Sequence, residues 1–270
     1  MKKIISSMEL IDTHSHLFVE EFSEDLPEVI ARAKEVGISR IYMPNIDCST
    51  VDSLLRVSKQ YAGYCYPLIG LHPTSVNETY LDELNRLKAL LEEVSFPVVG
   101  IGEVGLDLYW DRTFRKEQEA AFREQIAWAL SYDLPLVIHS RNAFDELYSI
   151  MCDYQNLPLR GIFHSFTGSQ EEAEKLLTFE YFMLGINGVL TFKKSTLPET
   201  LQRIPIERIV LETDSPYLAP VPCRGKRNES SYLKHTLARM AEVYGTTPEN
   251  VSQKTTENAL KVFKKGKIMA

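Results

Sequence analysis

Residues 9–17 read ELIDTHSHL, a short apolar segment that leads into two histidines spaced two positions apart. Four later segments follow a similar plan, in which a histidine or an acid comes within or directly after an apolar run: VVGIGEVGLD (98–107), PLVIHSR (135–141), GIFHSF (161–166) and RIVLETDSP (208–216). Such apolar runs are typical of buried β-strands. Because the carboxyl ends of strands gather at one face of a closed parallel barrel, the pattern predicts one shared site on a barrel.

Apolar runs alternate with amphipathic segments eight times along the chain. The runs, which we expect to form strands, are Leu10–His16, Arg40–Ile46, Tyr64–Leu71, Val98–Leu106, Pro135–His139, Gly161–His164, Tyr181–Ile186 and Arg208–Glu212. The amphipathic segments, which we expect to form helices, are Glu24–Val36, Val51–Tyr61, Leu81–Glu93, Phe114–Ser131, Ala143–Tyr154, Gln170–Phe179, Thr196–Arg203 and Ser231–Tyr244. Strand followed by helix eight times predicts an α/β fold of the (β/α)8, or TIM, barrel type. A ninth helix, Pro248–Lys264, is expected outside the ring, with Thr247 as its N-cap.

Length and composition are consistent with one barrel. The chain has 270 residues, of which 44% are hydrophobic, and a (β/α)8 barrel needs about 250 residues. No linker-like or low-complexity stretch divides it, so residues 1–270 are expected to form a single domain. The net charge of −7 argues against extended, sequence-independent wrapping of a polyanion. It leaves a phosphodiester substrate possible, because two divalent cations would add about four positive charges within one pocket.

The expected compartment is the cytoplasm. Four scattered cysteines form no CxxC pair, and a chain of this size does not need disulfides for stability, so we expect reduced thiols. The start Met1–Ile5 is basic and apolar, but Ser6 interrupts it too early for a secretory signal. No segment approaches the roughly 20 apolar residues that span a bilayer, so no membrane association is expected. Nothing in the sequence indicates an obligate protein partner.

The polar residues at the strand ends are suited to divalent cations. On an extended strand His14 and His16 would point to the same side and could chelate one ion. Glu103 lies in an apolar, glycine-punctuated run, where an unpaired buried carboxylate would cost several kcal/mol, so a cation or a hydrogen-bond partner is expected. His139 and His164 end two successive strands, and Asp214 follows the last one.

Several neighbouring acids are expected to support this site rather than to bind the metal. Asp12 precedes the histidine pair and is interpreted as structural, Asp107 as an orienting group, and Glu212 as a structural partner within the barrel. The combination predicts metal-assisted hydrolysis, in which a metal-activated water is the nucleophile. The sequence contains no Gly-x-Ser-x-Gly motif for a serine nucleophile.

The segments DTHSHL, GLHP, IGEVGLD, FREQIAWALSYDLPLVIHSR, GIFHSFTGS, LGINGVLTF, ETDSPYLAP, RGKRNES and ENALKVF resemble the successive motifs of the TatD-related deoxyribonuclease family. The resemblance runs in the same order over nearly the whole chain. It implies a TIM-barrel, metal-dependent hydrolase of the amidohydrolase-like group that acts as a nuclease on DNA. It also implies two divalent cations per subunit, one held by His14, His16, Glu103 and Asp214, and the other by Glu103, His139 and His164, with Glu103 as the bridge. Zn, Mn, Mg and Fe are not distinguished.

The resemblance further implies residues that contact the substrate. His72, in the Gly-x-His-Pro motif, is a candidate for contact with a phosphate or the leaving group, and a turn histidine is the alternative. Arg141, Arg224 and Lys226 are candidates for phosphate binding, as is Arg227 beside them. Two positions depart from the family's usual pattern: Ser230 stands where proline is common, and Lys261 where arginine is common.

The leading hypothesis is a cytoplasmic phosphodiesterase, a DNase that removes nucleotides from an end, with Asp214 and Glu103 as its catalytic acids. A second hypothesis keeps the barrel and metals but takes a small amide, lactone or phosphoester, or an aminoacyl-tRNA ester. A third is a non-catalytic scaffold with a decayed site. Decay would remove a ligand, whereas all six expected positions are filled.

Overall fold

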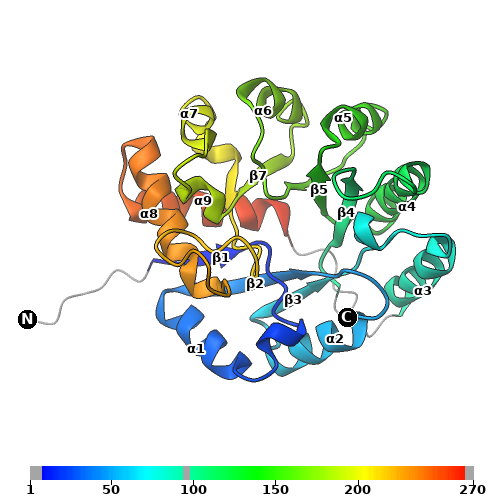
Figure 1. The fold of residues 1–270 in the computed structure, drawn as a ribbon, viewed down its shortest axis with the longest axis horizontal. Coiled ribbons are helices and arrows are strands. Elements are labelled where there is room, and N and C mark those ends of the chain that lie inside the picture. The colour runs from blue at the N-terminus through cyan, green and yellow to red at the C-terminus, as the bar shows by residue number, and fades with distance from the viewer. Residues whose placement is uncertain (1–7, 94–97, 265–270) are drawn as a thin grey trace, which may run out of the picture.

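The structure, a computed structural model, describes residues 8–93 and 98–264, and shows strands and helices alternating around a ring (Figure 1). The strands are β1 (Leu10–Asp12), β2 (Ile38–Pro44), β3 (Cys65–Leu68), β4 (Ile101–Asp107), β5 (Leu136–Arg141), β6 (Gly161–Phe163), β7 (Phe182–Ile186) and β8 (Ile209–Leu211). The helices are α1 (Leu26–Glu35), α2 (Val51–Gln60), α3 (Tyr80–Glu92), α4 (Arg115–Tyr132), α5 (Phe144–Cys152), α6 (Gln170–Leu176), α7 (Leu197–Leu201), α8 (Leu233–Tyr244) and α9 (Pro248–Val262). Short 3-10 turns are η1 (Glu20–Phe22), η2 (Pro73–Ser75), η3 (Gly188–Thr191), η4 (Ile206–Arg208) and η5 (Ser230–Tyr232). The predicted order of elements is confirmed, and the early segment Met1–Ile5 lies outside the described residues.

All strand pairings in the barrel are parallel. Continuous pairing joins β1, β2 and β3 in one sheet and β4 to β8 in a second. Single bridges cross the two seams, Ile69 with Ile101 and Ser15 with Ser215, and the Thr13 N–H donates to the Leu211 carbonyl at 3.1 Å. The fold is therefore the expected (β/α)8 barrel, with looser pairing at the seams between β3 and β4 and between β8 and β1.

The core has an inner and an outer part. Inside the ring, alternate strand residues such as Ile11, Val137 and Val210 form one buried cluster, as the two-residue period of a strand requires. The larger cluster fills the space between the strands and the surrounding helices. Both faces of the strands are buried, which explains why their sequences are continuous apolar runs.

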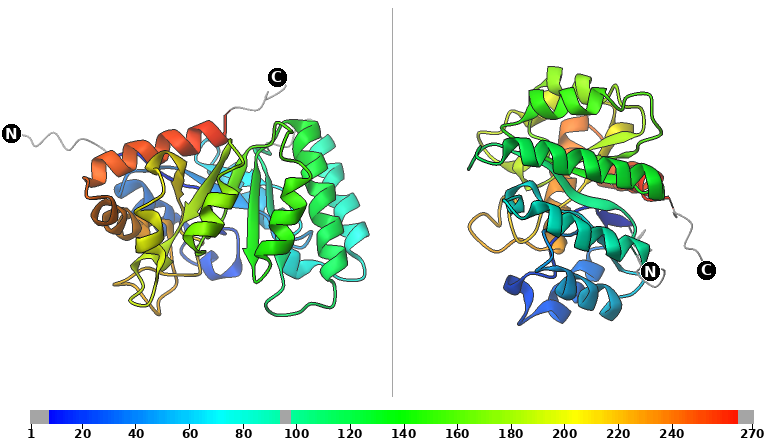
Figure 2. Two further views of the ribbon diagram at one scale, coloured as in Figure 1. Left: turned by 90° about the horizontal axis from the view of Figure 1, so that it is seen from above. Right: turned by 90° about the vertical axis from the view of Figure 1, so that its right-hand side faces the viewer.

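Helix α9 lies across the amino-terminal end of the barrel, so its predicted place outside the ring needs correction (Figure 2). Ala259, Val262 and Phe263 join the inner cluster, and the Phe263 ring stacks on Tyr42 with centroids 3.6 Å apart. Thr247 caps the helix by accepting from the Asn250 N–H at 3.3 Å, as predicted. Apolar residues on α9 thus cover the end of the barrel opposite the strand carboxyl ends.

Most element bounds differ from the predicted ones by a few residues. Strand β1 ends at Asp12 rather than His16, and α7 spans only Leu197–Leu201. The histidine pair therefore lies in the segment after the strand. All four cysteines, Cys48, Cys65, Cys152 and Cys223, are free. Within residues 8–93 and 98–264, no helix is both long and apolar enough to cross a bilayer.

Candidate metal centre

The six predicted ligands meet at the carboxyl ends of the strands. They come from five parts of the ring: His14 and His16 after β1, Glu103 within β4, His139 within β5, His164 after β6, and Asp214 after β8. Parallel pairing brings these ends to one face, which is where barrel active sites are built.

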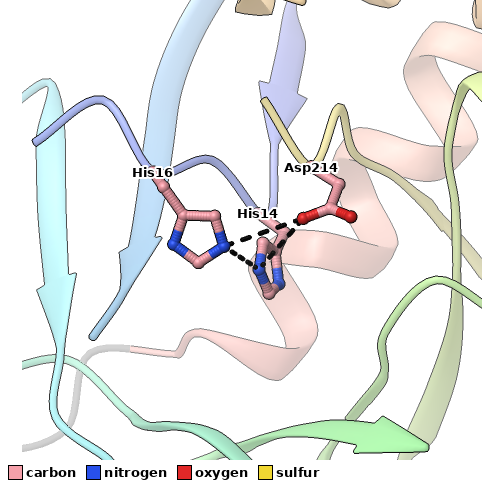
Figure 3. Close-up of side chains that lie close together, drawn as sticks. All are labelled: His14, His16 and Asp214. Carbon is pink, nitrogen blue, oxygen red and sulfur yellow. Dashed lines mark hydrogen bonds and ion pairs between the residues drawn. The ribbon is translucent and has the colours of Figure 1, made fainter. Parts of the chain in front are cut away.

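One group of donor atoms surrounds a single point beside β1 and β8 (Figure 3). The Nε2 atoms of His14 and His16 lie 3.1 Å apart, and each lies 3.7 Å from Asp214 Oδ1. Glu103 Oε2 lies 3.1 Å from His14 Nε2 and 3.6 Å from His16 Nε2. Tetrahedral ligand atoms about 2.1 Å from one cation would lie roughly 3.4 Å from each other, so these separations suit a single ion.

The other oxygen of Glu103 faces a second group. Glu103 Oε1 lies 2.8 Å from His139 Nδ1, 3.4 Å from His72 Nε2 and 3.8 Å from His164 Nε2. The two carboxylate oxygens thus point to different imidazole groups. His72 lies closer to this oxygen than His164 does, although His164 is the ligand implied by the family resemblance.

Two further carboxylates, those of Asp107 and Glu212, each face a ring nitrogen of a candidate ligand histidine. Asp107 Oδ2 lies 3.0 Å from His139 Nε2, as expected of an orienting group. Glu212 Oε1 lies 3.0 Å from His164 Nδ1, and this electrostatic contact favours the protonated form of the ring. Carboxylates in such positions fix the orientation of a ligating ring and increase its basicity.

Backbone contacts hold the two candidate catalytic acids in place. The Glu103 N–H donates to the Asn45 carbonyl at 3.1 Å, which fixes β4 against the end of β2. Asp214 has a left-handed backbone, φ 59°, and its N–H donates to the His14 carbonyl at 2.9 Å. A non-glycine residue in this region is uncommon and persists only where its surroundings impose it. Asn228 helps to hold the Asp214 backbone in this conformation by donating a hydrogen bond to the Thr213 carbonyl at 2.9 Å.

Buried amides extend this support. Gln118 on α4 pairs with both the N–H and the carbonyl of Asp107, at 2.9 and 3.1 Å. Gln125, two turns later, pairs with the N–H and carbonyl of Leu71, next to His72. Asp12 accepts from the Thr213 N–H and hydroxyl at 2.9 and 2.7 Å, which supports its interpretation as structural.

Neighbouring histidines lower the pKa of both central acids, the buried Glu103 and the partly buried Asp214. Only 3% of Glu103 is exposed. Burial alone would raise its pKa, but His14, His72 and other neighbouring rings hold it well below the usual value. The pKa of Asp214 is likewise lowered, because His164 and nearby rings outweigh its burial. Among the described residues, neither acid forms an ion pair with a lysine or arginine, so the cluster is suited to a cation.

Two of the histidines, His139 and His164, have raised pKa values, whereas burial lowers the pKa of His14 and of His72. Burial lowers the pKa of His139, but hydrogen bonding to Asp107 and Glu103 raises it to about 9. Facing Glu212 and other acids raises the pKa of His164 to about 10 despite burial. Protons on these rings would balance the acids when no cation is present. A divalent cation would also supply positive charge, and it would compete with those protons for the imidazole nitrogens.

Among the predicted substrate-contacting residues, Arg141 is the last residue of β5, and Arg224, Lys226 and Arg227 lie on the loop after β8. The Arg141 guanidinium stands 4.0 Å above the Tyr109 ring, and that of Arg224 stands 3.8 Å above Phe192. Lys226 is exposed. Arg227 is already engaged, with two hydrogen bonds to Asp25 at 2.8 and 2.7 Å and Phe22 beneath it.

Sequence reasoning missed one feature, the exposed pair Tyr109 and Trp110 beside Arg141. Two aromatic residues between Asp107 and Asp111, in an otherwise polar loop, were an available signal. The apolar patterns that predict strands do not identify exposed aromatic residues in a loop.

Comparison with known proteins places the chain in a family. Residues 11–264 match the family described as "TatD related DNase". A Bacillus subtilis (strain 168) protein named "Uncharacterized metal-dependent hydrolase YabD" is 38% identical over 256 residues, covering 94% of this chain and 99% of the relative. A Pectobacterium carotovorum (strain PC1) protein named "3'-5' ssDNA/RNA exonuclease TatD" is 30% identical, covering 94% and 99%. The crystal structure of Escherichia coli YjjV, a TatD homologue, superposes with a TM-score of 0.85 at 27% identity, covering 95% and 98%. The chain belongs to the TatD-related DNase family.

Proposed function

We propose that this protein is a metal-dependent nuclease that removes nucleotides from the end of a DNA strand by hydrolysis of phosphodiester bonds. The observation that carries the proposal is the position of Glu103, whose two oxygens face two separate imidazole groups. Hydrolases with two cations use such a bridging carboxylate to hold the ions a few ångströms apart.

His14, His16, Glu103 and Asp214 would hold the first cation. Glu103, His139 and His164 would hold the second, and His72 lies 3.4 Å from the same Glu103 oxygen. The mixed nitrogen and oxygen donors suit Zn, Mn, Fe or Mg. Divalent cations bound there would lower the pKa of a coordinated water and stabilise negative charge on the phosphate.

The residues of the chain supply the remaining chemistry. The Asp214 carboxylate has a lowered pKa and is partly exposed, so it is suited to accept a proton from the attacking water. Asp107 keeps the His139 ring oriented through its outer nitrogen. Burial of Glu103 and His14 excludes bulk water, which strengthens each electrostatic contact in the site.

The substrate assignment is supported by the relatives that are named as exonucleases of single-stranded DNA and RNA. Arg224 and Lys226, on the loop after Asp214, are exposed and suited to backbone phosphates. We infer that the enzyme works in the cytoplasm, which the four free thiols support.

Metal analysis combined with a nuclease assay tests the proposal. Glu103→Ala and Asp214→Asn should each bind less metal and lose activity on end-labelled DNA by on the order of 100-fold or more. Glu78→Gln is the matched control, because Glu78 is an exposed acid that forms no ion pair with a proposed ligand among the described residues. Full activity in both variants, or a wild-type protein that no divalent ion activates, would contradict the mechanism.

A further inference from the structure

An exposed aromatic pair stands beside the candidate metal centre. In Trp110, 72% of the residue is exposed, and in Tyr109, 51%. The two rings meet edge to face with centroids 4.8 Å apart. The other tryptophan, Trp128, is 2% exposed. Leaving a large aromatic ring in water forgoes the burial free energy that usually places it inside.

The pair is fixed to the site by short contacts. Asp107, which faces His139 with one oxygen, accepts from the Tyr109 N–H with the other at 3.0 Å. The Leu108 N–H donates to the Arg141 carbonyl at 2.9 Å, so the loop continues the pairing of β4 with β5. The rings therefore have a defined position relative to the metal ligands.

Arg141 adds a positive charge to this aromatic pair to form one exposed surface. Its guanidinium lies 4.0 Å from the centroid of Tyr109 and 5.2 Å from that of Trp110. No carboxylate forms an ion pair with Arg141 among the described residues. A partner for this surface needs a planar, polarisable ring that stacks on aromatic groups, and a negative charge close to that ring.

An unpaired nucleotide meets both requirements. Base faces stack on exposed aromatic side chains regardless of sequence, and the adjoining phosphate can reach an arginine. In a duplex, by contrast, each internal base face is covered by the next base pair. We propose that Tyr109, Trp110 and Arg141 form a stacking platform for bases of a single strand whose end lies at the metal centre. This inference rests on the proposed nuclease function and adds a base-binding site to it.

Substrates with and without bases test the platform. The wild type should cleave a single-stranded oligonucleotide with a KM about 10-fold lower than that for an abasic strand of equal length and charge. Tyr109→Ala combined with Trp110→Ala should remove most of that difference in KM between the two strands. Tyr181→Ala is the control, because Tyr181 is 58% exposed but precedes β7, at the opposite end of the barrel.

Tryptophan fluorescence gives a readout independent of activity. In EDTA, a bound oligonucleotide should quench Trp110, whereas a bound abasic strand should not. Trp110→Phe should lose the quenching and retain most of the affinity, because phenylalanine still stacks.

The outcomes separate the two proposals. If the double variant keeps the wild-type preference for base-bearing strands, or if emission is unchanged while fluorescence anisotropy shows binding, the platform is wrong and the nuclease function stands. If the wild type cleaves neither strand, the nuclease function fails and the platform fails with it.

Discussion

The carboxylate of Glu212 occupies the space beside Gly185, where a Cβ atom would come within 2.3 Å of Glu212 Oε2. The other Glu212 oxygen accepts from the Ser165 N–H at 2.6 Å and lies 3.0 Å from His164 Nδ1. A glycine in β7 therefore makes room for an acid after β8, and this acid faces a candidate ligand after β6.

Gly185→Ala should displace the Glu212 carboxylate and loosen His164. We expect a loss of about 1–3 kcal/mol in the free energy of unfolding, as for other overpacked cores, together with reduced metal content. Gly63→Ala is the control: Gly63 has φ +80° and no atom near its Cβ position, so that variant should lose stability without losing metal. Wild-type metal content in Gly185→Ala would show that Glu212 does not position His164.

Added divalent cations should stabilise the protein against heat. A cation at a free concentration about 100 times its Kd adds about 2.7 kcal/mol to the free energy of unfolding. This gain raises the Tm of a domain of this size by roughly 5–10 °C. The shift should be much smaller in Asp214→Asn and unchanged in Glu78→Gln, as differential scanning calorimetry can show. Equal shifts in all three proteins would place the binding outside the proposed cluster.

Removal of two positive charges from the loop after β8 should weaken DNA binding. Arg224→Ala with Lys226→Ala should raise KM for DNA, and the slope of log affinity against log salt should fall by about 1.4, at about 0.7 per phosphate contact. Arg56→Ala with Lys59→Ala removes the same residue types from exposed positions on α2 and is the control. A small-molecule hydrolase would show neither effect, so identical salt slopes would favour that alternative.

The ion pair between Arg32 and Glu229 should make stability depend on pH. Arg32 donates two hydrogen bonds to the Glu229 carboxylate, at 2.8 and 2.6 Å. Burial alone would raise the pKa of Glu229, but the bonds from Arg32 and Ser231 lower it. The contribution is therefore complete above the ordinary glutamate pKa of about 4.3 and is lost as the pH falls through the lower, folded-state pKa.

Urea unfolding of the wild type and Glu229→Gln measures this contribution. At pH 7 the variant should be less stable by about 1–3 kcal/mol, the range for hydrogen bonds to charged groups. The difference should shrink at the lowest pH at which the protein still folds. A difference that is the same at every pH would show that the charge of Glu229 does not matter.

Much of the fold followed from local patterns. The order of strands and helices and the cap at Thr247 were predicted, because apolar periodicity and capping chemistry act over a few residues. The end of β1 and the place of α9 were not. The end of β1 depends on its pairing with neighbouring strands. Helix α9 covers the barrel end because Phe263 stacks on Tyr42, a residue 221 positions earlier in the chain.

The sequence by itself determined the list of candidate ligands, since each follows or lies within an apolar run, and it determined the family through the order of motifs. Only the tertiary structure decided which donor atoms face one another. It brought His72 to within 3.4 Å of Glu103, joined Glu212 to His164, and left Tyr109 and Trp110 in water beside Arg141. These relationships connect residues on different strands, and their distances depend on closure of the barrel, which no local stretch of sequence encodes.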